Sequence, residues 1–254
     1  MALRKEPAAR PSLARVRQVL AQQKPAAPDP DSALGRLAAA AAAHEQQLAA
    51  AEAVRQKERT ERARRAALAT EARRTLRMIA EQLEGRIMQS ISTASIHWSS
   101  DSLTVRIGQG SLELDLSPSA EVINPDDFKR SGWDVVCGAV IGVGQDRPTH
   151  KRSANCWYTR QRSKAVDYRW YEVGYEGNPL TQRGFEFEPA AASVELADRA
   201  HSNAMDVVQV SCGPYPIDDE DTEFFLQRWT HILAEAAVGA LQRLPRRLPE
   251  KPPF

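Results

Sequence analysis

The chain has 254 residues, with 34 lysines and arginines, 33 aspartates and glutamates, and a formal net charge of +1 at pH 7. Its longest apolar run, from Val135 to Val143, is too short to cross a bilayer, and its first residues lack the apolar segment of a secretory signal. Three cysteines without CxxC spacing argue against a disulfide framework and a structural zinc site. We therefore expect a cytoplasmic protein without membrane contact, metal or cofactor.

Aromatic residues and charge divide the chain into two parts. All sixteen aromatic residues lie at or after Trp98, and aromatic side chains dominate buried cores. Residues 1–77 carry 16 basic and 8 acidic residues (net +8), whereas residues 78–254 carry 18 and 25 (net −7). The pattern predicts a disordered tail at 1–31, a long basic helix at 32–91, an α+β domain at 92–244 and a loose C-terminal tail at 245–254.

The first segment contains five prolines and many alanines, a composition typical of disorder. One stretch departs from it, because Ser12 can cap a helix that runs to Gln23 and carries Leu13, Val16 and Leu20 on one face. A helix this short is marginal in isolation. We expect a fluctuating tail, with a peptide that folds into a partner's groove as the alternative.

The proline-free stretch from Ser32 to Ile91 predicts one long helix with a partial heptad repeat. A single register places apolar or small residues at the core positions in two groups: Leu34, Leu37, Ala41, His44, Leu48 and Ala51, then Ala69, Ala72, Leu76, Ile79 and Leu83. Between the groups, the same positions hold Arg55, Glu58, Arg62 and Arg65. Because a 3.5-residue repeat keeps one stripe facing a partner, we expect a broken coiled coil, whose last third can instead pack on the following domain.

The middle of this helix is basic. Residues 55–77 hold nine lysines and arginines against three glutamates. One interpretation is a solvated face with ion pairs such as Glu58–Arg62 and Glu61–Arg65. The other is a stripe that binds phosphates or an acidic protein surface without reading sequence, with Arg55, Arg59, Arg62 and Arg65 as its candidate binding residues.

Alternating residues predict strands in the α+β domain. Leu103, Val105 and Ile107 alternate with polar residues, Gly108-Gln109-Gly110 turns the chain, and Leu112, Leu114 and Leu116 alternate again, which indicates a β-hairpin with one apolar face. Further strands are expected at Trp133–Val143, Ala154–Thr159, Asp167–Tyr175, around Phe185 and Phe187, and at Val207–Ser211, with helices at Ala190–Ala200 and from Phe225 to Ala240. The fold class is therefore a long helix followed by a mostly antiparallel sheet covered by a C-terminal helix.

Glycines in the expected central strand, Gly138, Gly142 and Gly144, match no phosphate-loop spacing and indicate a bulge or close packing. The acidic cluster from Asp218 to Glu223 is typical of a helix start rather than a metal site.

A basic and aromatic stretch supplies the remaining candidate binding residues: Lys151, Arg152, Trp157, Arg160, Arg162 and Trp170. Rings beside cations suit single-stranded nucleic acid or a nucleotide. The alternative is a hairpin with core aromatics and a basic turn. Exposure decides between them, because a stacking platform needs exposed indoles.

No catalytic motif is present. His97, His150 and His201 lie apart, and only a Cys156–His150 pair across a turn suggests a nucleophile. We expect a non-enzymatic adaptor or assembly protein that uses the Leu34–Ile87 helix for self-association or docking, with the α+β domain as a second binding surface. The alternatives are a sequence-independent nucleic-acid-binding protein and a small-ligand sensor whose sheet and last helix enclose a pocket.

Overall fold

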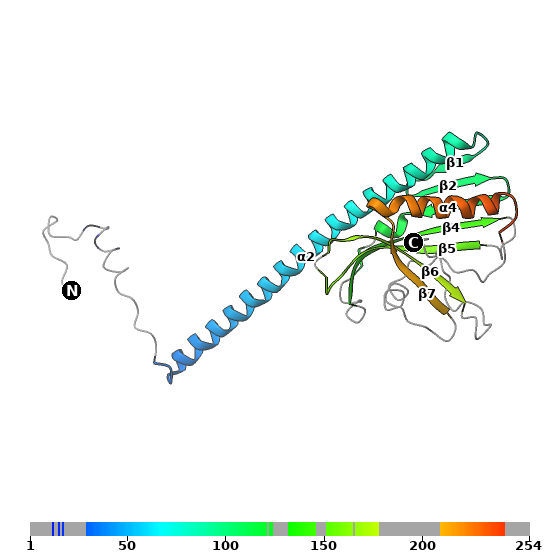
Figure 1. Ribbon diagram of the computed structural model, residues 1–254. Helices are drawn as coiled ribbons and strands as arrows, with labels where there is room; N and C mark the ends of the chain where they lie inside the picture. Colours follow the sequence, from blue (N-terminus) through cyan, green and yellow to red (C-terminus); the bar gives the residue numbers. More distant parts are fainter. Residues whose placement is uncertain are drawn as a thin grey trace, which may run out of the picture. The chain divides into compact units, whose positions relative to one another are not determined.

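A computed structural model describes residues 29–120, 122–123, 132–145, 151–164, 166–177 and 209–241, with Ser12, Arg15 and Arg17. The elements are α2 (Ala33–Ser90), β1 (Ser95–Trp98), β2 (Ser102–Ile107), β3 (Gly110–Asp115), η2 (Ser117–Ala120), β4 (Trp133–Gln145), β5 (Lys151–Gln161), β6 (Arg169–Gly177), β7 (Gln209–Pro216), η4 (Asp219–Asp221) and α4 (Thr222–Ala237). The predicted α+β class is confirmed: a seven-stranded antiparallel sheet follows α2 and precedes α4 along the chain (Figure 1).

The chain divides into two compact units, Met1–Thr60 and Glu61–Phe254. We expected the packed domain to begin near residue 92. The second unit also takes in the second half of the long helix, from Glu61 onward.

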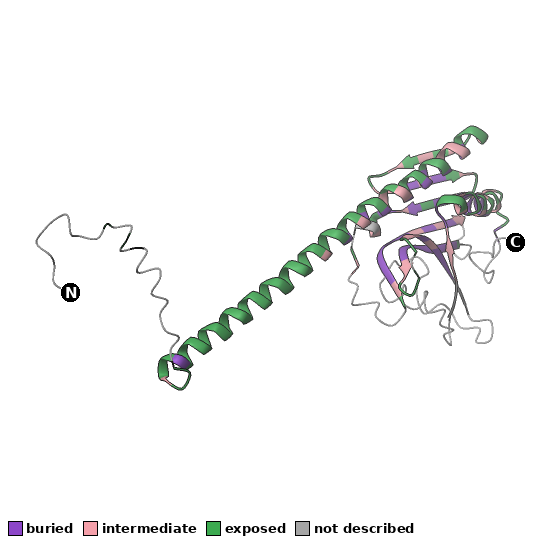
Figure 2. Cartoon of the chain, turned by 60° about the vertical axis from the view of Figure 1, so that its left-hand side comes forward, coloured by how far each residue is buried: buried purple, intermediate pink, exposed green. Residues whose placement is uncertain are grey.

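In the first unit, α2 begins where the sequence predicts a cap. The Gly35 amide donates a hydrogen bond of 2.9 Å to Ser32 Oγ, which satisfies one of the free N–H groups of the first turn. A Cβ at Gly35 would lie 1.9 Å from the Asp29 carbonyl oxygen, so this turn needs glycine. From Arg36 to Thr60 every residue is exposed, as the green ribbon of Figure 2 shows.

The sheet is a meander in which β1 to β7 lie side by side in chain order. The predicted hairpin forms β2 and β3, whose register runs from Ser102 opposite Asp115 to Ile107 opposite Gly110. Gly108 turns the chain with φ at +54°, a conformation that glycine adopts without strain. The four-residue strand β1, which sequence reasoning missed, pairs with β2 at the edge.

The core lies between one face of the sheet and the two helices. Residues of α2 after Glu61 pack with α4 and with the apolar residues of the strands in one buried cluster. The α2 members are Ala69, Ala72, Leu76, Ile79, Ala80, Leu83 and Ile87. Full burial of a leucine side chain stabilises the folded state by about 1.5–3 kcal/mol relative to leaving it exposed. Figure 1 shows α2 and α4 on this same face of the sheet.

The other face of the sheet carries no described helix. Ser111 and Glu113 point to it, because they alternate with Leu112 and Leu114 of the core face. Towards β5 this face is buried at Trp157.

Gly138 packs directly beneath the Trp157 ring, since a Cβ there would lie 2.5 Å from a ring carbon. Close packing therefore explains Gly138. The β-bulge occurs earlier in the strand, between Val135 and Cys137.

Several predicted elements lie outside the described residues. They are most of the helix from Ser12 to Gln23, the strand around Phe185 and Phe187, the helix at Ala190–Ala200, and the tail at 245–254. His150 and His201 also lie outside them.

Candidate functional site

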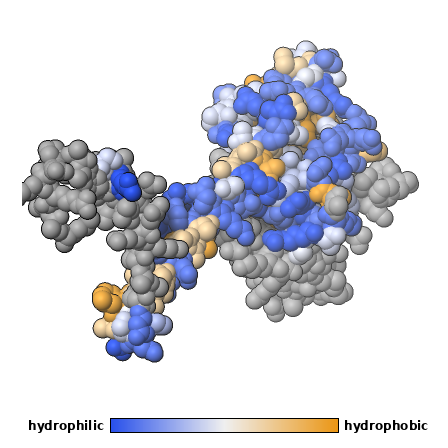
Figure 3. Space-filling view, turned by 90° about the vertical axis from the view of Figure 1, so that its left-hand side faces the viewer, coloured by the Kyte–Doolittle hydropathy of each residue, from blue (hydrophilic) through white to orange (hydrophobic). Residues whose placement is uncertain are grey.

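The first half of α2 carries an exposed apolar stripe. We call its six heptad core positions the exposed seam: Leu34, Leu37, Ala41, His44, Leu48 and Ala51. The three leucines are 70%, 66% and 58% exposed. In Figure 3, hydrophobic surface interrupts the hydrophilic residues at the start of α2. A stripe with this spacing has the pattern that one helix presents to another in a coiled coil.

After Thr60, the residues at the same heptad positions are buried in the core of the second unit. Ala69, Ala72, Leu76, Ile79 and Leu83 are all at most 5% exposed. Even Arg65, which occupies a core position that we expected to break the seam, is only 2% exposed. This half of the helix has its partner within the same unit.

Arg65 is paired with a buried carboxylate. Its Nη1 lies 2.7 Å from Asp134 Oδ1, and its Nη2 donates to the carbonyl oxygens of Ile123, at 3.0 Å, and Val135. The Tyr168 hydroxyl donates to the second carboxylate oxygen of Asp134. Arg160 lies 3.5 Å from that oxygen.

Burial alone raises the pKa of Asp134, but hydrogen bonds from Tyr168 and Arg65 outweigh it, so its pKa lies below the ordinary value. The predicted binding residues Arg65 and Arg160 therefore meet at a carboxylate that stays charged. Because these two arginines and Tyr168 surround that carboxylate, we assign the cluster a structural role in holding α2 against β4.

The predicted aromatic platform is not formed by its two tryptophans. Trp157 and Trp170 are both 0% exposed, so neither ring can stack on a base at the surface. Trp170 Nε1 donates to the Ala72 carbonyl oxygen at 2.9 Å, which binds the sheet to α2. Arg152, at 3% exposed, is buried as well.

The other residues of that stretch lie at opposite ends of β5. Arg162 is exposed beyond the strand's end, and its Nε donates to the Trp133 carbonyl oxygen at 2.9 Å. Lys151 is exposed at the strand's start. The hairpin therefore does not gather its cations on one surface.

The basic segment of α2 is mostly paired. Six of its nine cations form ion pairs: Arg55–Glu52, Arg64–Glu61, Arg65–Asp134, Arg73–Asp101, Arg74–Glu71 and Arg77–Glu81. Lys57, Arg59 and Arg62 are exposed and have no ion pair among the described residues. The ion pairs use other partners than the expected Glu58–Arg62 and Glu61–Arg65. The pairing favours a solvated face over a free phosphate-binding stripe.

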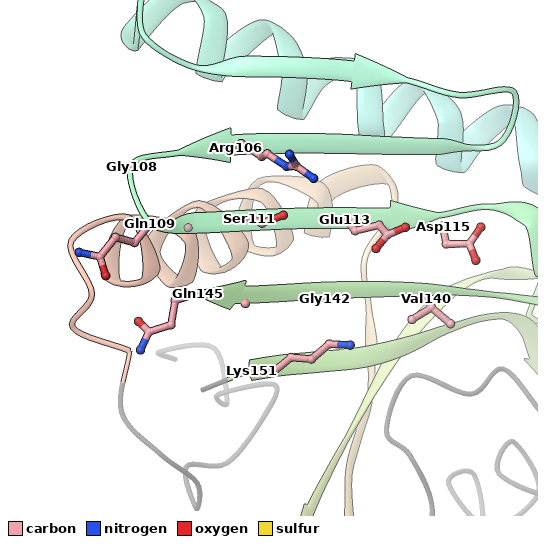
Figure 4. Close-up of a pocket in the computed structure, with 12 residues that line it drawn as sticks. Arg106, Gly108, Gln109, Ser111, Glu113, Asp115, Val140, Gly142, Gln145 and Lys151 are labelled. Atoms are coloured by element: carbon pink, nitrogen blue, oxygen red, sulfur yellow. The ribbon is translucent and has the colours of Figure 1, made fainter. Parts of the chain in front are cut away.

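A groove of about 530 Å³ lies on the face of the sheet that carries no described helix (Figure 4). It is lined by Arg106, Gly108, Gln109, Gly110, Ser111, Glu113, Asp115, Val140, Gly142, Gly144, Gln145 and Lys151. Its floor is β2 to β5, and strand register arranges this face in cross-strand rows. The basic row is Arg106, Ser111, Gly144 and Lys151; the first acidic row is Thr104, Glu113, Gly142 and Ser153; the second acidic row is Ser102, Asp115, Val140 and Asn155.

Sequence reasoning missed most of this groove. Arg106 and Glu113 were visible only as the polar face of the predicted hairpin. Their meeting with Gly142, Gly144 and Lys151 depends on strand register, which the sequence alone does not reveal.

Buried polar residues near Cys156 form structural contacts. Glu172 is fully buried, and it accepts hydrogen bonds from Arg228 and, at 2.8 Å, from Trp229 Nε1, which attaches β6 to α4. Burial raises the pKa of the Cys156 thiol well above its ordinary value and that of Cys137 to about 12, so neither favours a thiolate nucleophile.

The acidic cluster before α4 is also structural. Arg169 pairs with Asp218 at 2.8 Å and with Asp221 at 3.0 Å, and the Trp170 amide donates to Asp218. Within the described ranges, no group of histidine, cysteine and acidic side chains is arranged to hold a metal ion. No helix in the described part of the chain has both the length and the apolar character needed to cross a membrane.

Comparison with models of protein families, with curated protein sequences and with solved structures found no match to this chain.

Proposed function

We propose that this protein is a non-enzymatic assembly protein whose exposed seam pairs with the same seam of a second copy of the chain. The observation that supports the proposal is the exposure of Leu34, Leu37 and Leu48, at 58–70%, on one heptad stripe of an otherwise polar and alanine-rich helix segment. In this proposal, pairing of the exposed seams brings two copies of the α+β domain together.

The seam is suited to a second copy for two reasons. A heptad stripe is complementary to itself, because the leucines of one helix fit between those of the other. The small core residues Ala41 and Ala51 also allow close approach of two backbones. In a parallel pair, the flanking positions would place Gln47 opposite Glu52, so no like charges meet.

The expected association is weak. Covering the exposed part of each leucine contributes about 1–2 kcal/mol, and six leucines from two chains contribute about 6–12 kcal/mol in total. Association costs about 4–15 kcal/mol in lost freedom. A dimer of micromolar or weaker affinity follows, so its population should rise with protein concentration.

Light scattering of the full chain over a range of concentrations tests this proposal. We expect a dimer whose fraction falls on dilution, and a monomer for the triple variant Leu34→Glu, Leu37→Glu and Leu48→Glu. The matched control adds the same charge outside the seam, through Ala39→Glu, Ala42→Glu and Ala49→Glu, and should still dimerise.

A monomeric full chain at every concentration would overturn self-pairing, as would a control that dissociates as completely as the seam variant. Circular dichroism should show that both triple variants keep their helix. The full chain is needed, because a fragment starting at Ser92 would lose Leu76 and Leu83 from the core.

Sequence-independent nucleic-acid binding has less support. It would rest on Lys57, Arg59 and Arg62, since the other six cations of the segment already have acidic partners. Retention of duplex DNA at low salt that is lost in a Lys57→Gln, Arg59→Gln and Arg62→Gln variant would favour it.

A further inference from the structure

The exposed seam carries two polar residues at its middle. Between Leu34 and Ala51 the only titratable side chains are those of Arg36, His44 and Glu45. His44 occupies a core position of the heptad, and Glu45 follows it at a position that flanks the core. A polar residue at a core position lowers coiled-coil stability, so apolar packing between two helices does not explain this pair.

His44 and Glu45 have no partner within their own chain. Both are exposed, and their side chains form no hydrogen bond or ion pair with another residue that the structure describes. On a helix, the neighbours of a residue lie three and four positions away. Around His44 these neighbours are Ala40, Ala41, Gln47 and Leu48. The imidazole therefore has no charged neighbour on the helix, and a partner would have to come from outside the chain.

A second copy would bring the two His44 side chains together in either orientation. In a parallel pair each core residue faces its own copy, so both imidazoles lie in one layer. In an antiparallel pair that overlaps the whole seam, His44 faces Ala41 of the second copy, because these are the two central core positions. The two imidazoles then lie in adjacent layers, about 4.5 Å apart along the axis, the rise of three helical residues.

The surroundings of this layer suit a metal ion. Helix side chains lean towards the N-terminus, and the core residue before His44 in that direction is Ala41, whose methyl group fills little space. Glu45 adds a carboxylate beside each imidazole. Two imidazole nitrogens with one or two carboxylate oxygens are a donor set that Zn²⁺ binds in four-coordinate sites.

We infer that the two copies of His44, with Glu45 beside them, bind one Zn²⁺ between paired seams, so that zinc tightens the dimer. The inference rests on the proposed self-pairing, because one chain supplies only half of the ligands. Among the described residues of a single chain no complete group of metal ligands is present. The second copy is therefore needed to complete the site.

Sedimentation velocity of the full chain across a dilution series, in chelator or in tens of micromolar Zn²⁺, tests the inference. A metal that binds the dimer and not the monomer tightens association by about tenfold when its concentration is about ten times its dissociation constant. We expect at least this tightening in Zn²⁺. Equilibrium dialysis should find one zinc ion per two chains more in the original protein than in His44→Gln.

Three variants test the assigned ligands. His44→Gln should remove the effect of zinc and keep the dimer that forms in chelator, because glutamine is polar and is not a typical zinc ligand. Glu45→Gln should reduce the zinc effect. The matched control is His231→Gln, because His231 of α4 is exposed and its Nε2 lies 3.7 Å from a Glu235 carboxylate oxygen. This control should keep the full zinc effect, and circular dichroism should show that all three variants keep their helix.

Equal dissociation constants in chelator and in Zn²⁺ would overturn the inference and leave self-pairing intact. A zinc effect that persists in His44→Gln would also overturn it, because the metal would then act at another site. A chain that is monomeric in chelator and dimeric in Zn²⁺, with the effect lost in His44→Gln, would support the metal site and overturn pairing by leucines alone. A monomer under both conditions would overturn both proposals.

Discussion

The two halves of α2 share one heptad register and meet different surroundings. From Arg36 to Thr60 every residue is exposed, whereas from Arg65 to Leu83 the same heptad positions are buried in the core (Figure 2). A heptad pattern therefore predicts which stripe of a helix is covered. It does not identify the partner that covers this stripe. In the second half that partner is a β-sheet, a role that we had expected for the last third alone.

The largest difference in stability between the two environments of α2 is expected when the buried charge of Arg65 is removed. Arg65→Ala leaves Asp134 buried without its main cation, which should lower the free energy of unfolding by about 3–5 kcal/mol. The adjacent control Arg64→Ala removes an ion pair of 3.2 Å to Glu61 on the exposed face and should cost less than about 1 kcal/mol. Urea unfolding of both variants measures the difference, and equal losses would contradict the assignment of Arg65 to the core.

Truncating one leucine in each half sharpens the comparison. Leu76 is fully buried, so Leu76→Ala should cost about 2–5 kcal/mol. Leu37 is 66% exposed, and Leu37→Ala should change the stability of the dilute monomer by no more than about 0.5 kcal/mol. Chemical denaturation at low protein concentration tests both, and a large loss for Leu37→Ala would mean that its half of the helix already has a partner within the chain.

Repairing the polar position of the exposed seam should strengthen self-association. A polar residue at a core position lowers coiled-coil stability, so His44→Leu should tighten the dimer by about tenfold. Sedimentation velocity across a dilution series gives the dissociation constant. His44→Gln, which keeps the position polar, should leave that constant close to the original value.

The smallest expected effect concerns the ion pair between Arg86, in the second half of α2, and Glu223 of α4. Hydrogen bonds from Arg86, at 2.8 Å, and from Gln227 lower the pKa of Glu223 from 4.5 to about 2. Because the pKa is lower in the folded state, the stabilisation is present above pH 4.5 and is lost as the pH falls towards about 2.

Glu223→Gln should therefore lower the urea midpoint slightly at pH 6 and leave it unchanged near pH 2. Arg86→Gln should reproduce this pattern, since it removes the main donor. A difference between Glu223→Gln and the original protein that persists near pH 2 would exclude this origin.

Much of the fold follows from local sequence patterns. The cap at Ser32, the hairpin of β2 and β3 and the apolar face of α4 are each specified by neighbouring residues. Strand β1 was missed because Ser95–Trp98 is four residues long and only half-buried. Arg65 was expected to interrupt the apolar stripe because its partner Asp134 lies 69 residues away in the sequence. A charged residue at a core position can be predicted to be buried only when its partner is known.

The candidate site was harder to predict for the same reason. The cations of β5 were recognised, but sequence could not show that Trp157 and Trp170 point into packed surroundings. The groove needs the registers of three strand pairs at once. Single-residue shifts in any of them would move Glu113 or Lys151 to the other face.

The meander topology has a consequence for how the protein is made. Each strand pairs with its sequence neighbour, so the sheet can grow hairpin by hairpin as the chain leaves the ribosome. Its apolar face stays partly open until α4, the last described element, supplies Phe225, Trp229 and Leu233. A nascent chain that stops before Thr222 would carry an uncovered apolar sheet, so we expect such truncated products to aggregate or to be held by chaperones.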